Sequence, residues 1–152
     1  MKTAKMLVLS LAALAALGFG GEELSNVPFV FGPAHFEGGD QIVIQDVLAT
    51  STNLTAGDRV VVRGRYELKS HQKAKLCLYL TSRSAGDGSD VPTRSKEITS
   101  GSGEFELSEP VRHPGYLHLS FYRITGGTDF GCIYFGTESQ MSRIRNMNIS
   151  GK

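Results

Sequence analysis

Short apolar runs, each alternating with polar residues, follow one another from residue 39 to the end of the chain. In the run 74–81, for example, Leu76, Leu78 and Leu80 all fall on one side. A period of two is typical of β-strands with one buried face, and the Gly and Asp residues between the runs are typical of turns. The pattern predicts about seven or eight strands, at 41–48, 59–68, 74–81, 96–99, 103–107, 116–124 and 130–135, with a last edge strand at 147–149.

The segments between these runs indicate turns and no helix. Gly101, Ser102 and Gly103 predict a hairpin between the runs 96–99 and 103–107. No segment after residue 20 sustains the 3.6-residue apolar period of a crossover helix, which excludes a parallel βαβ architecture. We therefore expect an all-β domain over residues 39–152, an antiparallel two-sheet sandwich of about seven to eight strands, after an irregular lead-in at 21–38.

The N-terminus has the pattern of a signal peptide. Lys2 and Lys5 precede an uncharged apolar stretch, 6–17, and Gly18 and Gly20 supply small residues for cleavage. The stretch is too short to span a bilayer as a mature helix. Residues 1–20 are therefore expected to be removed on export, leaving a secreted or periplasmic protein without a transmembrane segment.

The charge balance bears on the class of partner. The chain has 16 Lys and Arg against 15 Asp and Glu, and removal of Lys2 and Lys5 with the leader leaves 14 against 15. A nearly neutral domain lacks the basic surface that binds nucleic acid, so we expect no nucleic-acid partner.

Cys77 and Cys132 are the two cysteines of the chain. Export exposes them to an oxidising compartment, and both thiols face the same side if their strands are neighbours in one sheet, so they are a disulfide candidate. The alternative is a pair of separate buried thiols that pack as small apolar side chains.

A polar and aromatic strand face is the candidate ligand-binding surface. It consists of Tyr116, His118 and Tyr122, extended by Tyr79 and Tyr134 if those strands share its parity. Exposed rings on a flat sheet stack on sugars, and His118 supplies a hydrogen-bonding group. The alternative is an ordinary solvated face in which Tyr serves β-propensity alone.

Metal and catalytic motifs are weak. Asp87 and Asp90 are weak candidates for calcium in the segment 82–94, and the four histidines lack the spacing of a zinc site. No cofactor or metal is therefore assigned. The chain has no GxSxG motif, and Ser70 and Lys73 match SxxK only by letter, so no catalytic residue is assigned.

Several motifs carry a resemblance: Gly39-Asp40 before an Ile/Val run, Gly57-Asp58 before the run from Val60 to Leu68, Ser70-His71, the run from Gly101 to Leu107, the run from His118 to Tyr122, and Phe130-Gly131 followed by Tyr134-Phe135-Gly136-Thr137. With these, residues 39–137 resemble a family of small, uncharacterised exported bacterial domains. The resemblance implies export and a β-sandwich, and it implies no activity because the family has none assigned.

The sequence favours an exported, non-enzymatic protein that binds a carbohydrate or another exported protein, or has a structural role in the envelope or extracellular space. One alternative is a hydrolase or lyase acting on polysaccharide, with His118 and either Asp129 or Glu106 in acid–base roles. Another is an adhesion domain stabilised by calcium at Asp87 and Asp90.

Overall fold

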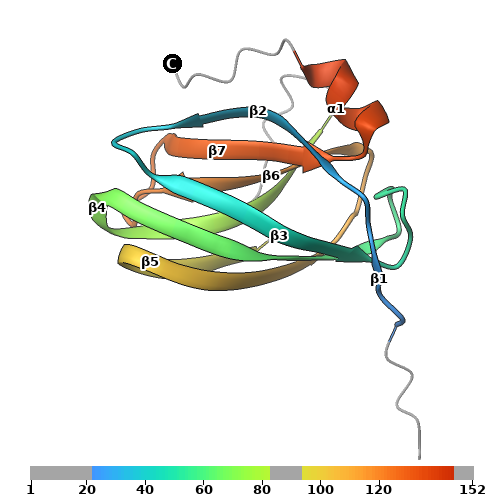
Figure 1. Cartoon of the computed structure of the whole chain (residues 1–152), viewed down its shortest axis with the longest axis horizontal. Coiled ribbons are helices and arrows are strands. Elements are labelled where there is room, and N and C mark those ends of the chain that lie inside the picture. The colour runs from blue at the N-terminus through green and yellow to red at the C-terminus, as the bar shows by residue number, and fades with distance from the viewer. Residues whose placement is uncertain (1–21, 83–93, 146–152) are drawn as a thin grey trace, which may run out of the picture.

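The computed structural model describes residues 22–82 and 94–145, which form seven strands and one short helix (Figure 1). In chain order these are β1 (Ser25–Asn26), β2 (Val30–Phe36), β3 (Gln41–Ala49), β4 (Arg59–Ser82), β5 (Arg94–Pro110), β6 (Gly115–Tyr122), β7 (Asp129–Gly136) and α1 (Glu138–Ile144). All strand pairs are antiparallel, which confirms the expected all-β class. The expected leader at 1–20, Asp87, Asp90 and the run 147–149 lie outside the described residues.

The long strand β4 belongs to both halves of the sheet. Its first half pairs with β3 and its second half with β6, while β5 pairs with it along both. The pairing of β4 with β5 shifts in register between Leu68 and Lys73. An irregularity of this kind lets a strand bend and turn a corner, so β4 passes from one half of the sheet to the other.

Two pairs of expected strands are single strands in the structure. The runs 59–68 and 74–81 both belong to β4, and the runs 96–99 and 103–107 both belong to β5. The expected hairpin at 101–103 is wrong, because Gly101 pairs with Leu68 within the ladder. Gly101 has a φ of +102°, a conformation that glycine adopts without strain, and so β5 follows the bend of β4.

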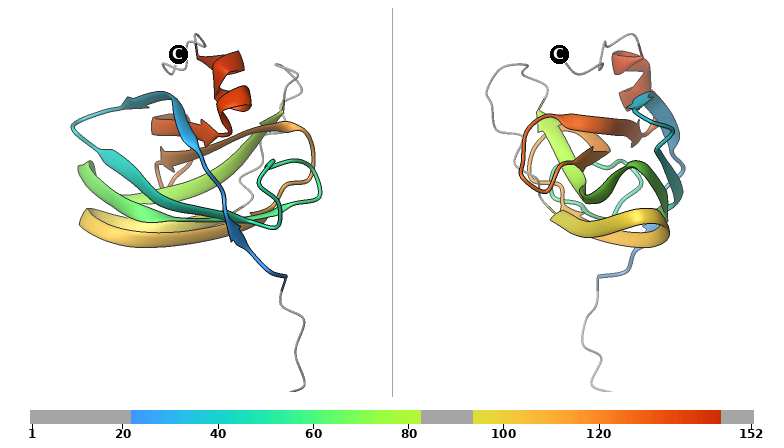
Figure 2. Two further views of the ribbon diagram at one scale, coloured as in Figure 1. Left: turned by 45° about the vertical axis from the view of Figure 1, so that its right-hand side comes forward. Right: turned by 90° about the vertical axis from the view of Figure 1, so that its left-hand side faces the viewer.

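The expected two-sheet sandwich is not confirmed, because one path of backbone pairing joins the seven described strands in the order β1-β3-β4-β6-β7-β2, with β5 on β4. Figure 2 shows this single sheet curling into a half-barrel. Its two halves face each other across one apolar core, which alternation along the strands supplies. The most completely buried core side chains come from both halves: Val60, Val62, Leu68, Leu76, Leu78, Leu119, Phe121, Phe130 and Phe135.

A buried carboxylate anchors the bend of β4. Asp40, in the turn before β3, is 2 % exposed and accepts hydrogen bonds from the backbone N–H groups of Lys69 and Ser70. It also accepts a hydrogen bond from the Ser70 hydroxyl, which leaves the neighbouring His71 Nδ1 as a donor to Ser70 Oγ. A hydroxyl held in this way is not activated by His71, so the group stabilises the corner and has no nucleophile.

The short helix α1 was not expected, since the tail after residue 136 was interpreted as weakly structured. Thr137 caps it: its hydroxyl accepts from the Gln140 N–H, and the Gln140 side chain accepts from the Thr137 N–H. Thr-x-x-Gln is a capping-box pattern and was available in the sequence. Met141 and Ile144 are buried in a small apolar cluster with Cys132 and Tyr134 of β7. Among the described residues, no helix has the length and apolar character to cross a membrane.

Candidate functional site

The five residues of the expected aromatic face do lie together, on the outer face of β4, β6 and β7. The His118 ring stacks between Tyr79 and Tyr134, with centroids 5.2 and 4.6 Å away, and the Tyr122 ring lies 5.4 Å from Tyr79. Their expected exposure is wrong for the three central rings, which are only 6 to 8 % exposed. Tyr116 and Tyr122 are half-buried. A flat platform for stacking on sugar is therefore not what the described residues present.

His118 is not placed for acid–base work. Burial lowers the pKa of its imidazole to about 4, so the ring is neutral at ordinary pH. Its Nδ1 lies 3.1 Å from the Thr81 hydroxyl. The suggested partners lie elsewhere: Asp129 contacts His35, and Glu106 forms an ion pair with Arg63 on the other half of the sheet. The pairing of His118 with either carboxylate is not assembled among the described contacts.

The expected disulfide is wrong. Cys77 and Cys132 do face the same side, but Ser120 of β6 lies between them as the register partner of both. Two strand spacings place the cysteine Cα atoms roughly 9.5 Å apart, beyond the roughly 7 Å that a disulfide can bridge. Both are free buried thiols, as the alternative interpretation had it.

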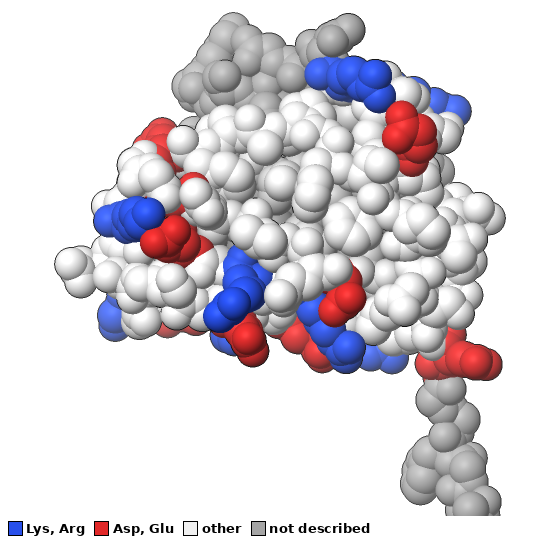
Figure 3. Space-filling model, in the orientation of Figure 1, with Lys and Arg blue, Asp and Glu red and all other residues white. Residues whose placement is uncertain are grey.

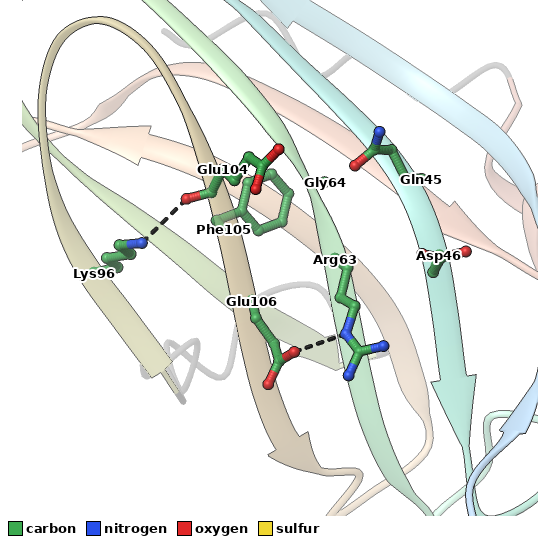
Figure 4. A pocket seen from close by; sticks show the side chains of 8 residues that line it. All are labelled: Gln45, Asp46, Arg63, Gly64, Lys96, Glu104, Phe105 and Glu106. Atoms are coloured by element: carbon green, nitrogen blue, oxygen red, sulfur yellow. Dashed lines mark hydrogen bonds and ion pairs between the residues drawn. The ribbon is translucent and has the colours of Figure 1, made fainter.

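An open hollow of about 340 Å³ lies on the other half of the sheet, over β3, β4 and β5 (Figure 4). Gly64 lies at its floor, where the strands and the Phe105 ring approach closely: a Cβ there would lie 2.2 Å from the Val43 carbonyl oxygen and 2.9 Å from the Phe105 ring. Next to it, the pairing of β3 with β4 shifts in register between Ile44 and Asp46. A glycine inside a β-branched run is the sequence signal that marks such a close approach.

Polar side chains from three strands line this hollow. Arg63 Nε donates to Glu106 Oε2 at 2.7 Å, and Lys96 Nζ donates to the Glu104 carbonyl oxygen at 3.1 Å (Figure 4). Within the part of the chain that the structure describes, the side chains of Gln45, Asp46 and Glu104 have no polar partner. The hollow therefore offers two free carboxylates and an amide, which makes it rich in hydrogen-bond acceptors. Its complete lining is Gln45, Asp46, Arg63, Gly64, Lys96, Glu104, Phe105 and Glu106.

The surrounding surface carries charges of both signs. Figure 3 shows Lys and Arg beside Asp and Glu along the lower edge, over β4 and β5, and no single-sign patch on this side. In the rows of the sheet, Arg63 lies between Asp46 and Glu106. Mixed charge of this kind agrees with the nearly neutral charge balance of the chain.

A second polar cluster lies at the other end of the molecule, where β2 pairs with β7. His35 is the direct register partner of Cys132, and its Nδ1 lies 3.4 Å from Cys132 Sγ. The other ring nitrogen, Nε2, lies 3.3 Å from Asp129 Oδ2. The side chains of His35 and Asp129 are 20 and 24 % exposed, whereas Cys132 is 4 % exposed. The cluster therefore opens to solvent on its imidazole and carboxylate side.

Sequence reasoning named Glu106, Asp129 and Cys132 in other roles, but it did not predict either group of residues. Asp129 and Cys132 differ by three positions, which in a regular strand places them on opposite faces. The pairing of β6 with β7 is irregular, however: Phe121 pairs with Gly131 while Tyr122 pairs with Asp129. The extra residue, Phe130, brings Asp129 to the face of Cys132. No local pattern in the sequence predicts this bulge.

Comparison with protein-family models, curated proteins and solved structures finds no match to this chain. The resemblance to exported domains stays a prediction, and the function has to be argued from the geometry.

Proposed function

We propose that this is an exported, non-enzymatic binding protein, and that the hollow on β3, β4 and β5 is its ligand site. The observation that carries the proposal is the set of unpaired acceptors, Gln45, Asp46 and Glu104, on the rim of an open concave surface. Polar groups held on strands keep their positions before a ligand arrives, which lowers the entropic cost of binding.

The chemistry of the hollow favours a neutral, polyhydroxylated ligand such as a carbohydrate. Hydroxyl groups donate to the free carboxylates of Asp46 and Glu104, and hydrogen bonds to charged groups are stronger than those between neutral groups. An anionic ligand would be repelled by three carboxylates against two cations in the lining. The aromatic face first considered is a weaker candidate, because its three central rings are buried.

A non-enzymatic role is supported by the state of the lining residues. Glu106, the carboxylate suggested for polysaccharide hydrolysis, is ion-paired with Arg63 and more than half exposed. Acid–base catalysis needs a carboxyl group that can exchange a proton with the substrate, whereas the carboxylate of Glu106 is held by the Arg63 guanidinium.

The test is a binding screen of the purified protein against soluble polysaccharides and an oligosaccharide array. Gln45→Ala and Asp46→Asn remove acceptors of the hollow, and Gln41→Ala, an exposed glutamine of the same strand outside the lining, is the matched control. We expect binding that both hollow variants weaken at least about 10-fold and that the control keeps. Binding that survives in both variants, or that is lost only in a Tyr116→Ala/Tyr122→Ala protein, would place the site elsewhere. No binding to any glycan would remove the carbohydrate assignment.

The prediction of export rests on residues 1–20 alone, so it is tested separately. Cells producing the full chain are expected to release or hold in the periplasm a protein that begins after Gly18 or Gly20. N-terminal sequencing decides this, and an intact Met1 on a cytosolic protein would contradict it.

A further inference from the structure

We infer that His35, Asp129 and Cys132 form a binding site for a divalent zinc-class metal ion. One ligand atom of each residue lies within 4.8 Å of the other two, a spacing at which a single ion can be shared. The site is separate from the hollow on β3, β4 and β5, and it does not depend on the carbohydrate proposal.

The donor set selects the class of ion. A thiolate, an imidazole and a carboxylate are the three side-chain ligands that zinc takes in proteins, whereas calcium and magnesium take oxygen alone. Ligand atoms on a tetrahedral zinc ion lie roughly 3.3 to 3.6 Å apart, given its bond lengths of about 2.0 to 2.3 Å. The 3.4 Å between Cys132 Sγ and His35 Nδ1 is of this size, as is the 3.3 Å between Asp129 Oδ2 and the other ring nitrogen, Nε2. A single His35 nitrogen cannot make both contacts as they stand.

The geometry also defines what must change on binding. The thiol approaches Nδ1 of His35 and the carboxylate approaches Nε2, so the two groups meet different nitrogens of the ring. Binding of one ion therefore requires His35 or Asp129 to rotate, and both side chains are partly exposed. Cys132 stays at the floor of the site and the ion enters from the solvent side, with a fourth position left for water or a small ligand.

The same three residues in the order Cys–His–Asp also resemble a cysteine nucleophile with its base and orienting acid. The surroundings of Cys132 argue against that role. Cys132 is 4 % exposed, so its sulfur is covered against a bulky substrate, whereas a single ion can reach it from the side of His35 and Asp129. The charge of a bound divalent ion favours the thiolate, and binding releases the thiol proton.

The experiment titrates the metal-free full protein with zinc by calorimetry and with cobalt by absorption, where a bound thiolate gives a sulfur-to-cobalt charge-transfer band. We expect one ion per chain and the charge-transfer band. Cys77→Ala is the matched control, since Cys77 is an equally buried thiol of the same sheet face that is not part of the cluster. Cys132→Ala is expected to abolish the band and weaken zinc binding by more than about 100-fold, and Cys77→Ala to change neither.

Asp129→Asn keeps the size of a partly exposed side chain, so it tests the site even if Cys132→Ala unfolds the protein. It is expected to weaken zinc binding at least about 10-fold without a change in the circular dichroism spectrum. Three results would overturn the inference: zinc binding that Asp129→Asn leaves unchanged, a cobalt complex without the charge-transfer band, or an unfolded, unreduced protein that shows no free thiol.

Discussion

The outer side chains of β4 change character at its bend. Before the bend they include Arg63 and Arg65, which are exposed. Arg63 lies between Asp46 of β3 and Glu106 of β5, and Arg65 lies opposite Glu104 of β5. Beyond the bend they include Cys77 and Tyr79, which are buried among other rings and thiols. Both stretches have the same period of two, so alternation alone does not say which outer face meets water.

The two outer faces differ in whether other residues pack over them. On the β2–β7 side, α1 packs Met141 and Ile144 against Tyr134 and Cys132, and the rings of the neighbouring strands stack on one another. On the β3–β5 side, no described element lies over the strands, and the outer residues pair with one another across the sheet. The packing on the covered face therefore stabilises the fold, whereas the open face is solvated and carries the proposed binding site.

The largest expected effect contrasts one side chain from each face. Tyr134→Ala removes a ring that stacks on His118 and packs with α1, and we expect it to lower the free energy of unfolding by about 3 to 4 kcal/mol. Val43→Ala removes a side chain that is 50 % exposed on the open face, and we expect a loss below about 1 kcal/mol. Urea unfolding measures both, and equal losses would contradict the contrast between the faces.

The second expected effect is a pH dependence of the free energy of unfolding, caused by His118 on the covered face. Burial lowers the pKa of His118 from 6.5 to about 4, so the unfolded chain binds more protons than the folded chain in acid. The contribution of His118 to the free energy of unfolding is complete above pH 6.5 and is lost between pH 6.5 and 4, and it amounts to about 3 kcal/mol.

His118→Phe keeps a stacked ring without a titrating group, so this variant is the control for the pH dependence. Urea unfolding at several pH values is expected to show a smaller loss of stability in His118→Phe than in the wild type between pH 6.5 and 4. The same slope in both proteins would mean that other groups cause it.

The third effect tests α1 as a cover. Thr137→Ala removes the capping hydroxyl and is expected to cost about 1 kcal/mol. In a Cys77→Ala background it should also speed the reaction of Cys132 with a thiol reagent, because Met141 and Ile144 would leave their contacts more often. Ser139→Ala, exposed on the same helix, is the control and should leave the rate unchanged.

The smallest effect belongs to the open face. Arg63 and Glu106 are each about half exposed, at 49 and 58 %, so the ion pair is screened by water. Arg63→Ala is expected to lower stability by less than about 1 kcal/mol, and a double-mutant cycle with Glu106→Ala at low and high salt measures the pair itself. A coupling that is large and independent of salt would contradict the description of this face as solvated.

Several features were predictable from the sequence because they depend on local rules. The edges of β3 and β7 agree within a residue or two with the expected runs 41–48 and 130–135. The shared parity of Cys77 and Cys132 was also correct, since alternation within each strand decides it. The capping box of α1 was present as Thr137 and Gln140, although it was not used.

Other features depend on contacts between segments far apart in the chain. The order of strands puts β6 between the two cysteines, so correct parity still led to a wrong disulfide. The bulge at Phe130 brings Asp129 to Cys132 and His35, and only pairing with β6 reveals it.

The sequence by itself determined that this is an antiparallel β protein with alternating apolar positions, because side-chain period and turn chemistry are local properties of the chain. Only the tertiary structure decided that β4 bends so that one sheet curls into a half-barrel around the core, and that one outer face is covered while the other is open. Strand order, bulges and cover depend on which distant segments pack together, and that choice is made by the burial of the whole core.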